Sequence, residues 1–194
     1  MADFNQALSK TLGHEGGFQN NARDWANWLG GKPVMEQYLQ AKAIAHYTTS
    51  ASLLPKLLGT KYGITAQDIA KLAALDITVA IEDLTVEYAA IFYRHEYWNT
   101  LYDGINDQLL GEKLFDIGVL MGVHTAVKLL QISLAPGISA VGDGVFGPIT
   151  LAQTNERGNL AGYRIVLINH CMNIINTNPN EAQFVSGWIT RINS

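Results

Sequence analysis

Apolar residues recur at helical spacing along most of this 194-residue chain, and this pattern constrains the fold more than any other feature. Residues that repeat every three or four positions share one face of a helix, which a partner must then bury. Such stripes predict helices near residues 4–15, 65–75, 86–97, 109–134, 160–175 and 184–192. Strand signals are few, and residues 61–65 carry the best one. The chain is therefore predicted to be mainly α, a helical globule with at most a small β element.

Capping residues and helix breakers mark the boundaries of these helices. Thr65-Ala66-Gln67-Asp68 has the pattern of a capping box, in which a hydroxyl accepts a hydrogen bond from an amide of the first turn. Gly118 and Gly122 indicate either a close helix contact or a break inside the long segment 109–134. Asn178-Pro179 ends the helix that begins near residue 160.

Residues 32–58 stand apart from this pattern. Pro33 suits the first turn of a helix, and a Ser/Thr-rich turn follows at residues 48–52, so the segment is interpreted as an inserted helical hairpin. A lid and a structural extension are both open interpretations. We expect residues 1–106 to form one region, with this insertion at about 32–58, and residues 107–194 to form a helical region packed on it.

Composition excludes several classes of function. A formal charge of −4 offers no basic surface for nucleic acid. The single cysteine, Cys171, excludes an internal disulfide and lies in an apolar run, where a buried filler is expected. The N-terminus has no signal peptide pattern, and the apolar stretches are too short to cross a bilayer. We expect synthesis in a bacterial cytoplasm, no stable membrane insertion, and a monomer.

Glu15 is the one carboxylate that local periodicity places on an apolar face. Phe4, Leu8 and Leu12 step by four positions, and Glu15 continues their stripe three residues later. Gly16-Gly17 then predicts the end of the helix and open space beside the carboxyl group. A carboxyl group half-buried against apolar side chains is pushed toward its protonated form, which suits a general acid. Position alone fits an ordinary surface carboxylate equally well.

Polar and aromatic residues downstream are candidates for the rest of a site. Asp24 follows Glu15 across a Gly/Asn-rich turn, and glycoside hydrolysis needs a second group that stabilises the cation or positions water. The segment 60–65 supplies the hydroxyls of Thr60, Tyr62 and Thr65. Among the tryptophans, Trp25 and Trp28 flank Asp24 in a polar loop and are the predicted stacking surfaces for sugar rings, whereas Trp98 is expected to anchor the core.

Other catalytic patterns fail their context tests. Residues 142–147 fit G-x-G-x-x-G, but no strand precedes them and an acidic residue lies where phosphate would approach, so a structural turn is expected. The five histidines lack the spacing of zinc ligands, and no G-x-S-x-G elbow is present. We therefore expect neither a metal nor a cofactor.

Several motifs together resemble one known family. They are His14-Glu15-Gly16-Gly17-Phe18, Asp24, Gly30-Gly31 and Thr60-Lys61-Tyr62-Gly63-Ile64-Thr65. This set resembles the signature of glycoside hydrolase family 108, the lysozyme-like N-acetylmuramidases common in phages and prophages. In that family the pattern D-x-G-G-x-T-x-x-G-I-T is one compact run, which the insertion splits here. Phe115-Asp116, the segment 143–150 and the segment 184–191 resemble the predicted peptidoglycan-binding region that follows the catalytic part.

The resemblance implies a lysozyme-like fold and an enzyme that cleaves the β-1,4 bond between N-acetylmuramic acid and N-acetylglucosamine. The implied general acid is Glu15. Asp24 and Thr60 are its candidate partners, since the step from Glu15 to Asp24 is similar to the Glu-x8-Asp step of phage lysozymes, where a Thr completes the site. The implied partner is the glycan strand of periplasmic peptidoglycan, as for an endolysin that lyses bacteria, although a secreted effector would have the same features.

Two alternatives remain open at this stage. A lytic transglycosylase would use the same acid but let a hydroxyl group of the substrate attack, so that no second carboxylate is essential. A catalytically idle wall-binding module would retain the recognition residues without turnover.

Overall fold

The computed structural model describes residues 1–43, 56–135 and 142–194, and it divides into two compact units. Met1–His14 and Arg94–Ser194 form the first, which we call the helical unit. Glu15–Tyr93 form the second, which we call the hairpin unit. The predicted division near residue 106 therefore differs from the observed one. The first helix groups with the C-terminal region because Phe4 packs edge-on against Trp98 and Phe115, with ring centroids 5.4 and 5.7 Å apart.

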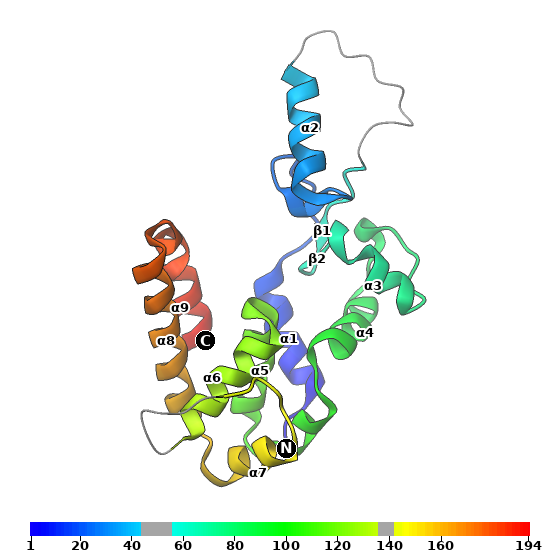
Figure 1. The fold of residues 1–194 in the computed structure, drawn as a ribbon. Helices are drawn as coiled ribbons and strands as arrows, with labels where there is room; N and C mark the ends of the chain where they lie inside the picture. The colour runs from blue at the N-terminus through cyan, green and yellow to red at the C-terminus, as the bar shows by residue number, and fades with distance from the viewer. Residues whose placement is uncertain (44–55, 136–141) are drawn as a thin grey trace. The chain divides into compact units, whose positions relative to one another are not determined.

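The helical unit consists of α- and 3₁₀-helices in its described residues (Figure 1). Its elements are α1 (Phe4–Glu15), which continues by one residue into the hairpin unit, η5 (Thr100–Gly104), α5 (Gln108–Met121), α6 (Val123–Leu134), α7 (Pro148–Arg157), α8 (Leu160–Thr177), η6 (Pro179–Phe184) and α9 (Val185–Asn193). Gly122, with φ +88°, separates α5 from α6, so the glycines of the long segment mark a break. In Figure 1, α8 and α9 lie side by side.

Helix α5 is the centre of the helical unit, because every residue from Leu110 to Gly118 on it is buried. Trp98 packs edge-on against Phe115 of this helix, with ring centroids 5.6 Å apart, and its indole donates a hydrogen bond to Asp103 at 3.0 Å. Trp98 is buried, as expected for a core anchor. Cys171 is likewise buried in α8.

The hairpin unit is built around the small sheet. Its elements are η1 (Trp25–Asn27), α2 (Gly31–Ala43), β1 (Thr60–Lys61), β2 (Ile64–Thr65), η3 (Ala66–Asp68), α3 (Ile69–Ala74), η4 (Ile81–Asp83) and α4 (Val86–Tyr97), which continues into the helical unit. The strands are antiparallel, with Thr60 opposite Thr65 and Lys61 opposite Ile64. Gln19 extends this ladder through a bridge to Thr60.

The predicted mainly α class is confirmed, and the predicted strand region forms the small sheet. Helix α2 covers the first part of the inserted segment, whereas the predicted turn at residues 48–52 lies outside the described residues, so the helical hairpin stays a prediction. Helix α7 was not predicted, although Pro148 occupies its first turn, where proline is favoured.

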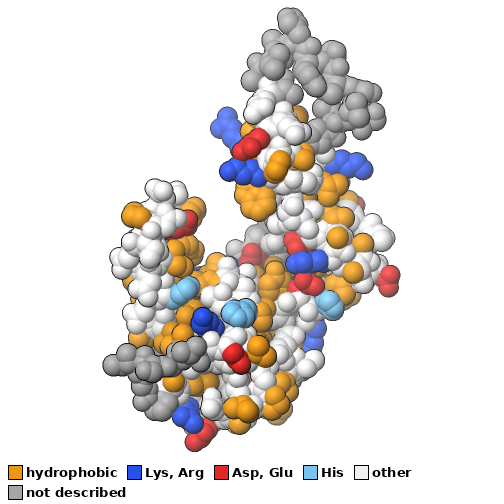
Figure 2. All heavy atoms as spheres, viewed as in Figure 1, with side chains coloured by type: hydrophobic (Ala, Val, Ile, Leu, Met, Phe, Trp, Pro, Cys, Tyr) orange, Lys and Arg blue, Asp and Glu red, His pale blue; other side chains and the backbone are white. Residues whose placement is uncertain are grey.

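Acidic and basic side chains are intermixed on the face that Figure 2 displays. No helix within residues 1–43, 56–135 and 142–194 has both the length and the apolar character needed to cross a bilayer.

Candidate active site

Glu15 is the last residue of α1, and its side chain is partly exposed. Gly16 follows with φ +71°, a conformation that L side chains rarely adopt, and so the helix ends where the sequence predicted. A Cβ atom built on Gly16 or on Gly17 would meet no heavy atom within 4 Å. The two glycines therefore leave open space directly after the carboxylate.

The turn between the two strands lies against this carboxylate. A Cβ atom built on Gly63 would be 2.6 Å from Oε2 of Glu15 and 2.6 Å from the hydroxyl of Tyr93. Only glycine fits there, since Gly63 also has φ +74°. The turn backbone thus closes on Glu15 from one side, while the hydroxyl of Tyr93 and the carboxylate share the space beside the same glycine.

Tyr93 comes from α4 and is only 2% exposed. Its hydroxyl donates a hydrogen bond of 2.6 Å to the carbonyl of Tyr62, which lies in the turn with φ +54°. A non-glycine residue with positive φ is strained, and this hydrogen bond helps to hold it. The chain from Tyr93 through Tyr62 to Gly63 therefore sets the position of the turn that contacts Glu15.

Asp24 and Thr60 are joined by two amide side chains. Asp24 accepts hydrogen bonds from the backbone of Ala26 at 3.1 Å, as the N-cap of η1, and from Gln19 at 3.2 Å. Gln19 and Asn27 exchange side-chain hydrogen bonds of 3.0 and 2.9 Å. Thr60 donates to the same Asn27 at 2.6 Å. The structure thus brings the two candidate partners into one polar network.

The two tryptophans beside Asp24 differ. Trp25 is 50% exposed, and its role as a stacking surface stays a prediction. Trp28 is only 1% exposed, so its prediction as a sugar-stacking surface is wrong in this structure. Its indole N–H donates to the carbonyl of Ala22 at 3.0 Å, and its ring packs on Tyr38 with centroids 4.7 Å apart. Since its polar atom is satisfied internally, Trp28 is buried despite the polar loop around it.

The remaining predicted residues, Tyr62 and Thr65, lie in the β-hairpin formed by β1 and β2. Tyr62 is partly exposed, and the ammonium of Lys61 lies 5.4 Å from its ring centroid. Thr65 forms the predicted capping box, accepting from the Gln67 amide at 3.1 Å and donating to Asp68 at 3.0 Å. Its hydroxyl therefore has a structural task, which the prediction of a substrate-binding role did not include.

Sequence reasoning missed four residues of this arrangement: Gln19, Asn27, Gly63 as a contact of Glu15, and Tyr93. Tyr93 lies within the helix predicted at residues 86–97, and no local pattern marks its hydroxyl as part of a site. Gly63 was visible inside the family motif, but no local signal connects it with α1. In the described part of the chain, no three His, Cys, Asp or Glu side chains come together in a manner suited to a metal ion.

Comparison with known proteins gives one family and one fold. The sequence model described as glycosyl hydrolase 108 matches residues 8–122. A structure of SagA from Brucella abortus aligns with a TM-score of 0.61, at 22% identity, over 98% of this chain and 89% of that one. This likeness confirms the predicted lysozyme-like, mainly α fold. The search of curated proteins found no match.

Proposed function

Because the chain belongs to glycosyl hydrolase family 108 and is thus a glycoside hydrolase, we propose that it is an N-acetylmuramidase. Its substrate would be the β-1,4 bond between N-acetylmuramic acid and N-acetylglucosamine in peptidoglycan. The observation that supports this proposal best is the placement of Glu15, partly exposed beside two open glycines and bounded by the hairpin turn. A general acid needs such a position, reachable by a leaving oxygen and held by its surroundings.

In the proposed reaction the protonated carboxyl group of Glu15 gives its proton to the glycosidic oxygen. The bond between this oxygen and the anomeric carbon breaks, the ring flattens toward an oxocarbenium ion, and water adds its oxygen to the anomeric carbon. The proton that this water loses passes to the carboxylate left on Glu15, which restores the acid. Asp24 and Thr60, joined through Gln19 and Asn27, are the proposed groups that orient the water or stabilise the cation.

A lytic transglycosylase is the second candidate, and one feature of the network favours it. Both oxygens of Asp24 accept hydrogen bonds from the protein, and the Thr60 hydroxyl donates to Asn27, so both partners carry structural hydrogen bonds. A transglycosylase needs no second carboxylate, because the C6 hydroxyl of the muramoyl residue attacks. Mass spectrometry of digested peptidoglycan separates the two, since only the transglycosylase leaves 1,6-anhydromuramoyl ends.

The decisive experiment is Glu15→Gln, which keeps the shape of the side chain and removes the proton that it donates. We expect turnover of purified peptidoglycan to fall by roughly 10²- to 10⁴-fold, the usual contribution of a general acid, with little change in the unfolding midpoint. Glu82→Gln is the matched control, because Glu82 is an exposed carboxylate of the same unit. Undiminished turnover by a folded Glu15→Gln protein contradicts the assignment, whereas binding to peptidoglycan without any turnover by the unmodified chain would leave a purely wall-binding role.

The proposed place of action is the peptidoglycan outside the cytoplasmic membrane, as for an endolysin that reaches the wall after synthesis in the cytoplasm. We also propose that the protein acts as a monomer.

A further inference from the structure

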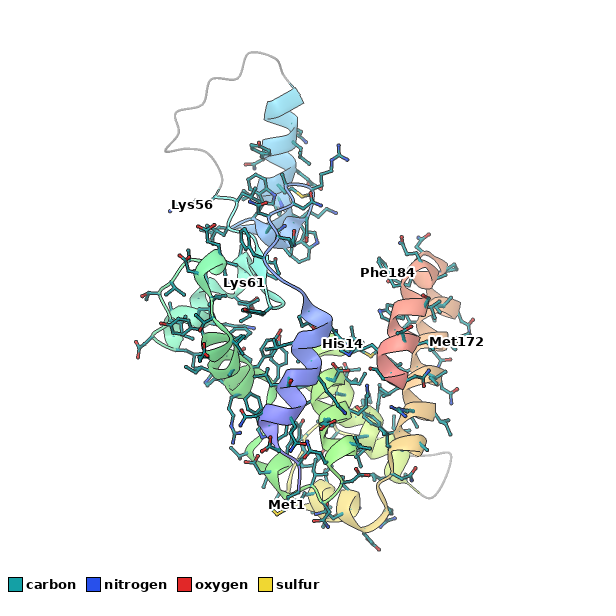
Figure 3. The ribbon with its side chains drawn as sticks, turned by 180° about the vertical axis from the view of Figure 1, so that it is seen from behind. Met1, His14, Lys56, Lys61, Met172 and Phe184 are labelled. Atoms are coloured by element: carbon teal, nitrogen blue, oxygen red, sulfur yellow. The ribbon has the colours of Figure 1, made fainter. Side chains whose placement is uncertain are left out.

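The helical unit contains a cavity of about 320 Å³ that the proposed reaction does not use. Its walls come from α1, α5 and α8 and from the residue that follows α9. His14, at the end of α1 (Figure 3), is one of its lining residues. The volume is at the lower end of small-molecule sites, which span roughly 300–1,000 Å³.

Buried charges line this cavity. Glu112, Lys113 and Asp116 are all buried, although charged side chains are seldom buried unless they are paired. Glu112 forms an ion pair with Lys10 and accepts a hydrogen bond from Gln108 at 2.8 Å. Both buried carboxylates have cationic partners, because Asp116 accepts from Arg191 at 3.0 Å and from Lys113 at 3.5 Å.

The cations outnumber these two carboxylates. Arg164 donates to the backbone carbonyls of Ile192 and Asn193, at 2.9 and 3.0 Å, and among the described residues it has no ion pair with a side-chain carboxylate. Lys113 shares its one carboxylate with Arg191 and gives a second hydrogen bond to the carbonyl of Arg191 at 2.6 Å. Among the side chains that line the cavity, the cations Lys10, Lys113 and Arg164 exceed the carboxylates Glu112 and Asp116 by one.

Charges of both signs surround Lys113. Burial lowers the pKa of its ammonium group most, Asp116 opposes this effect, and the Arg164 and Arg191 guanidinium groups lower the pKa to a smaller extent. Like charges crowded in a partly desolvated site attract an anion from solution.

We propose that this cavity binds a carboxylate group of a short peptide of the kind that peptidoglycan carries on its glycan strands, an inference that rests on the proposed function. The planar fork of Arg164, held by two carbonyls, suits a carboxylate. Glu112 on the wall disfavours the higher charge of a phosphate and can accept an N–H of a peptide. The apolar sides of Leu109, which is 52% exposed, and Leu160 suit the methyl groups of alanine residues.

The test is calorimetric titration of the 194-residue chain with Glu15→Gln, which does not depend on turnover. The probe is the tripeptide L-Ala-γ-D-Glu-L-Lys. The comparison ligands are its fully amidated form, an uncharged N-acetylglucosamine oligomer, and inorganic phosphate. We expect the free tripeptide to bind and the amidated form to bind at least about tenfold more weakly, since a hydrogen bond to a charged group contributes about 1.5–3 kcal/mol.

Two variants locate the site. Lys10→Gln removes a half-exposed cation of the cavity wall. Arg164→Lys keeps the positive charge but loses the planar guanidinium group. Each substitution should weaken tripeptide binding about tenfold. Lys128→Gln on α6, exposed and outside the cavity, should leave binding unchanged. Equal binding of the amidated peptide, displacement by phosphate at equal concentration, or unchanged binding in both folded variants would overturn the proposal. Binding without any wall hydrolysis by the unmodified chain would sink the proposed function and leave this site standing.

Discussion

At the scale of single residues, Gly63 determines how closely the turn between β1 and β2 approaches Glu15. Gly63→Ala would place a methyl group 2.6 Å from the carboxylate and 2.6 Å from the Tyr93 hydroxyl. The Glu15 side chain is the more flexible of the two and should move. We expect a fall of about 10²-fold in turnover, as small displacements of catalytic groups can cause, and a loss of at least about 1 kcal/mol in the free energy of unfolding.

Gly122→Ala is the matched control for this substitution. Gly122 has φ +88° but open space around its Cβ position, so its replacement carries the cost of positive φ without a clash. Peptidoglycan turnover and urea unfolding of both variants would be measured. An equal loss of turnover in the two proteins would show that the contact with Glu15 is not what matters.

Tyr93→Phe removes one hydroxyl while it keeps the ring. The Tyr62 carbonyl then loses its donor, and the strained turn beside Glu15 is held less well. We expect kcat to fall roughly tenfold or more, with little change in KM, because a buried residue contacts no substrate.

Tyr163→Phe provides the comparison, because its equally buried hydroxyl also donates to a backbone carbonyl, that of Ala126 at 3.0 Å. Both variants should lose about 1 kcal/mol of stability, the usual net contribution of such a hydrogen bond. Only Tyr93→Phe should lose kcat, and a similar kcat in both would reduce Tyr93 to a structural role.

These residues also show how far the sequence predicts a site. Glu15 was found because helical spacing is local, and the residues that define it lie on one short helix. Tyr93 and Gly63 contact its surroundings from 78 and 48 positions away, and no pattern in the chain encodes such a contact. The prediction for Trp28 was wrong because a polar loop can still bury a tryptophan. The one polar atom of this side chain donates a hydrogen bond to a carbonyl of the same loop, so burial leaves it satisfied.

At the scale of elements, the cap at the N-terminus of η3 is expected to contribute to stability. Thr65 caps it in a reciprocal pair with Asp68, and removal of such a cap costs about 0.5–2 kcal/mol. Thr65→Ala should therefore lower the free energy of unfolding by about 1 kcal/mol with KM unchanged, whereas Thr65→Ser should retain both. Urea unfolding and initial rates on peptidoglycan check this. A raised KM at unchanged stability would instead support a role of Thr65 in substrate binding.

Elements were predicted well where hydrophobic periodicity and caps agree. The predicted helix at residues 86–97 coincides with α4, and Asn178-Pro179 ends α8 as expected. Helix α7 was missed because its sequence has a weak apolar stripe, with Thr150 and Thr154 as its buried residues. Their hydroxyls are satisfied by nearby groups, as in the 2.7 Å bond from Thr154 to the Thr150 carbonyl, so polar residues occupy core positions there.

The organisation of the whole molecule was the least predictable part. Helix α1 joins residues 94–194 through contacts that span about a hundred positions, such as Thr11 with Asp116 at 3.2 Å. Periodicity identifies the face of α1 that must be buried, but not which of several apolar helices buries it. The family match at residues 8–122 also crosses the boundary between the two units, so neither unit corresponds to the matched segment.

Stability against pH is a property of the whole molecule that one buried group should influence. Burial lowers the pKa of His170 on α8 below its ordinary value of 6.5. As the pH falls below 6.5, the unfolded chain therefore takes up a proton at this position before the folded chain does, and stability falls. His170→Gln removes this titration. Between pH 7.5 and pH 5, the variant should lose less unfolding free energy in urea than the unmodified chain, because their carboxylates titrate alike. An identical loss in the two proteins would mean that the burial of His170 does not limit stability in mild acid.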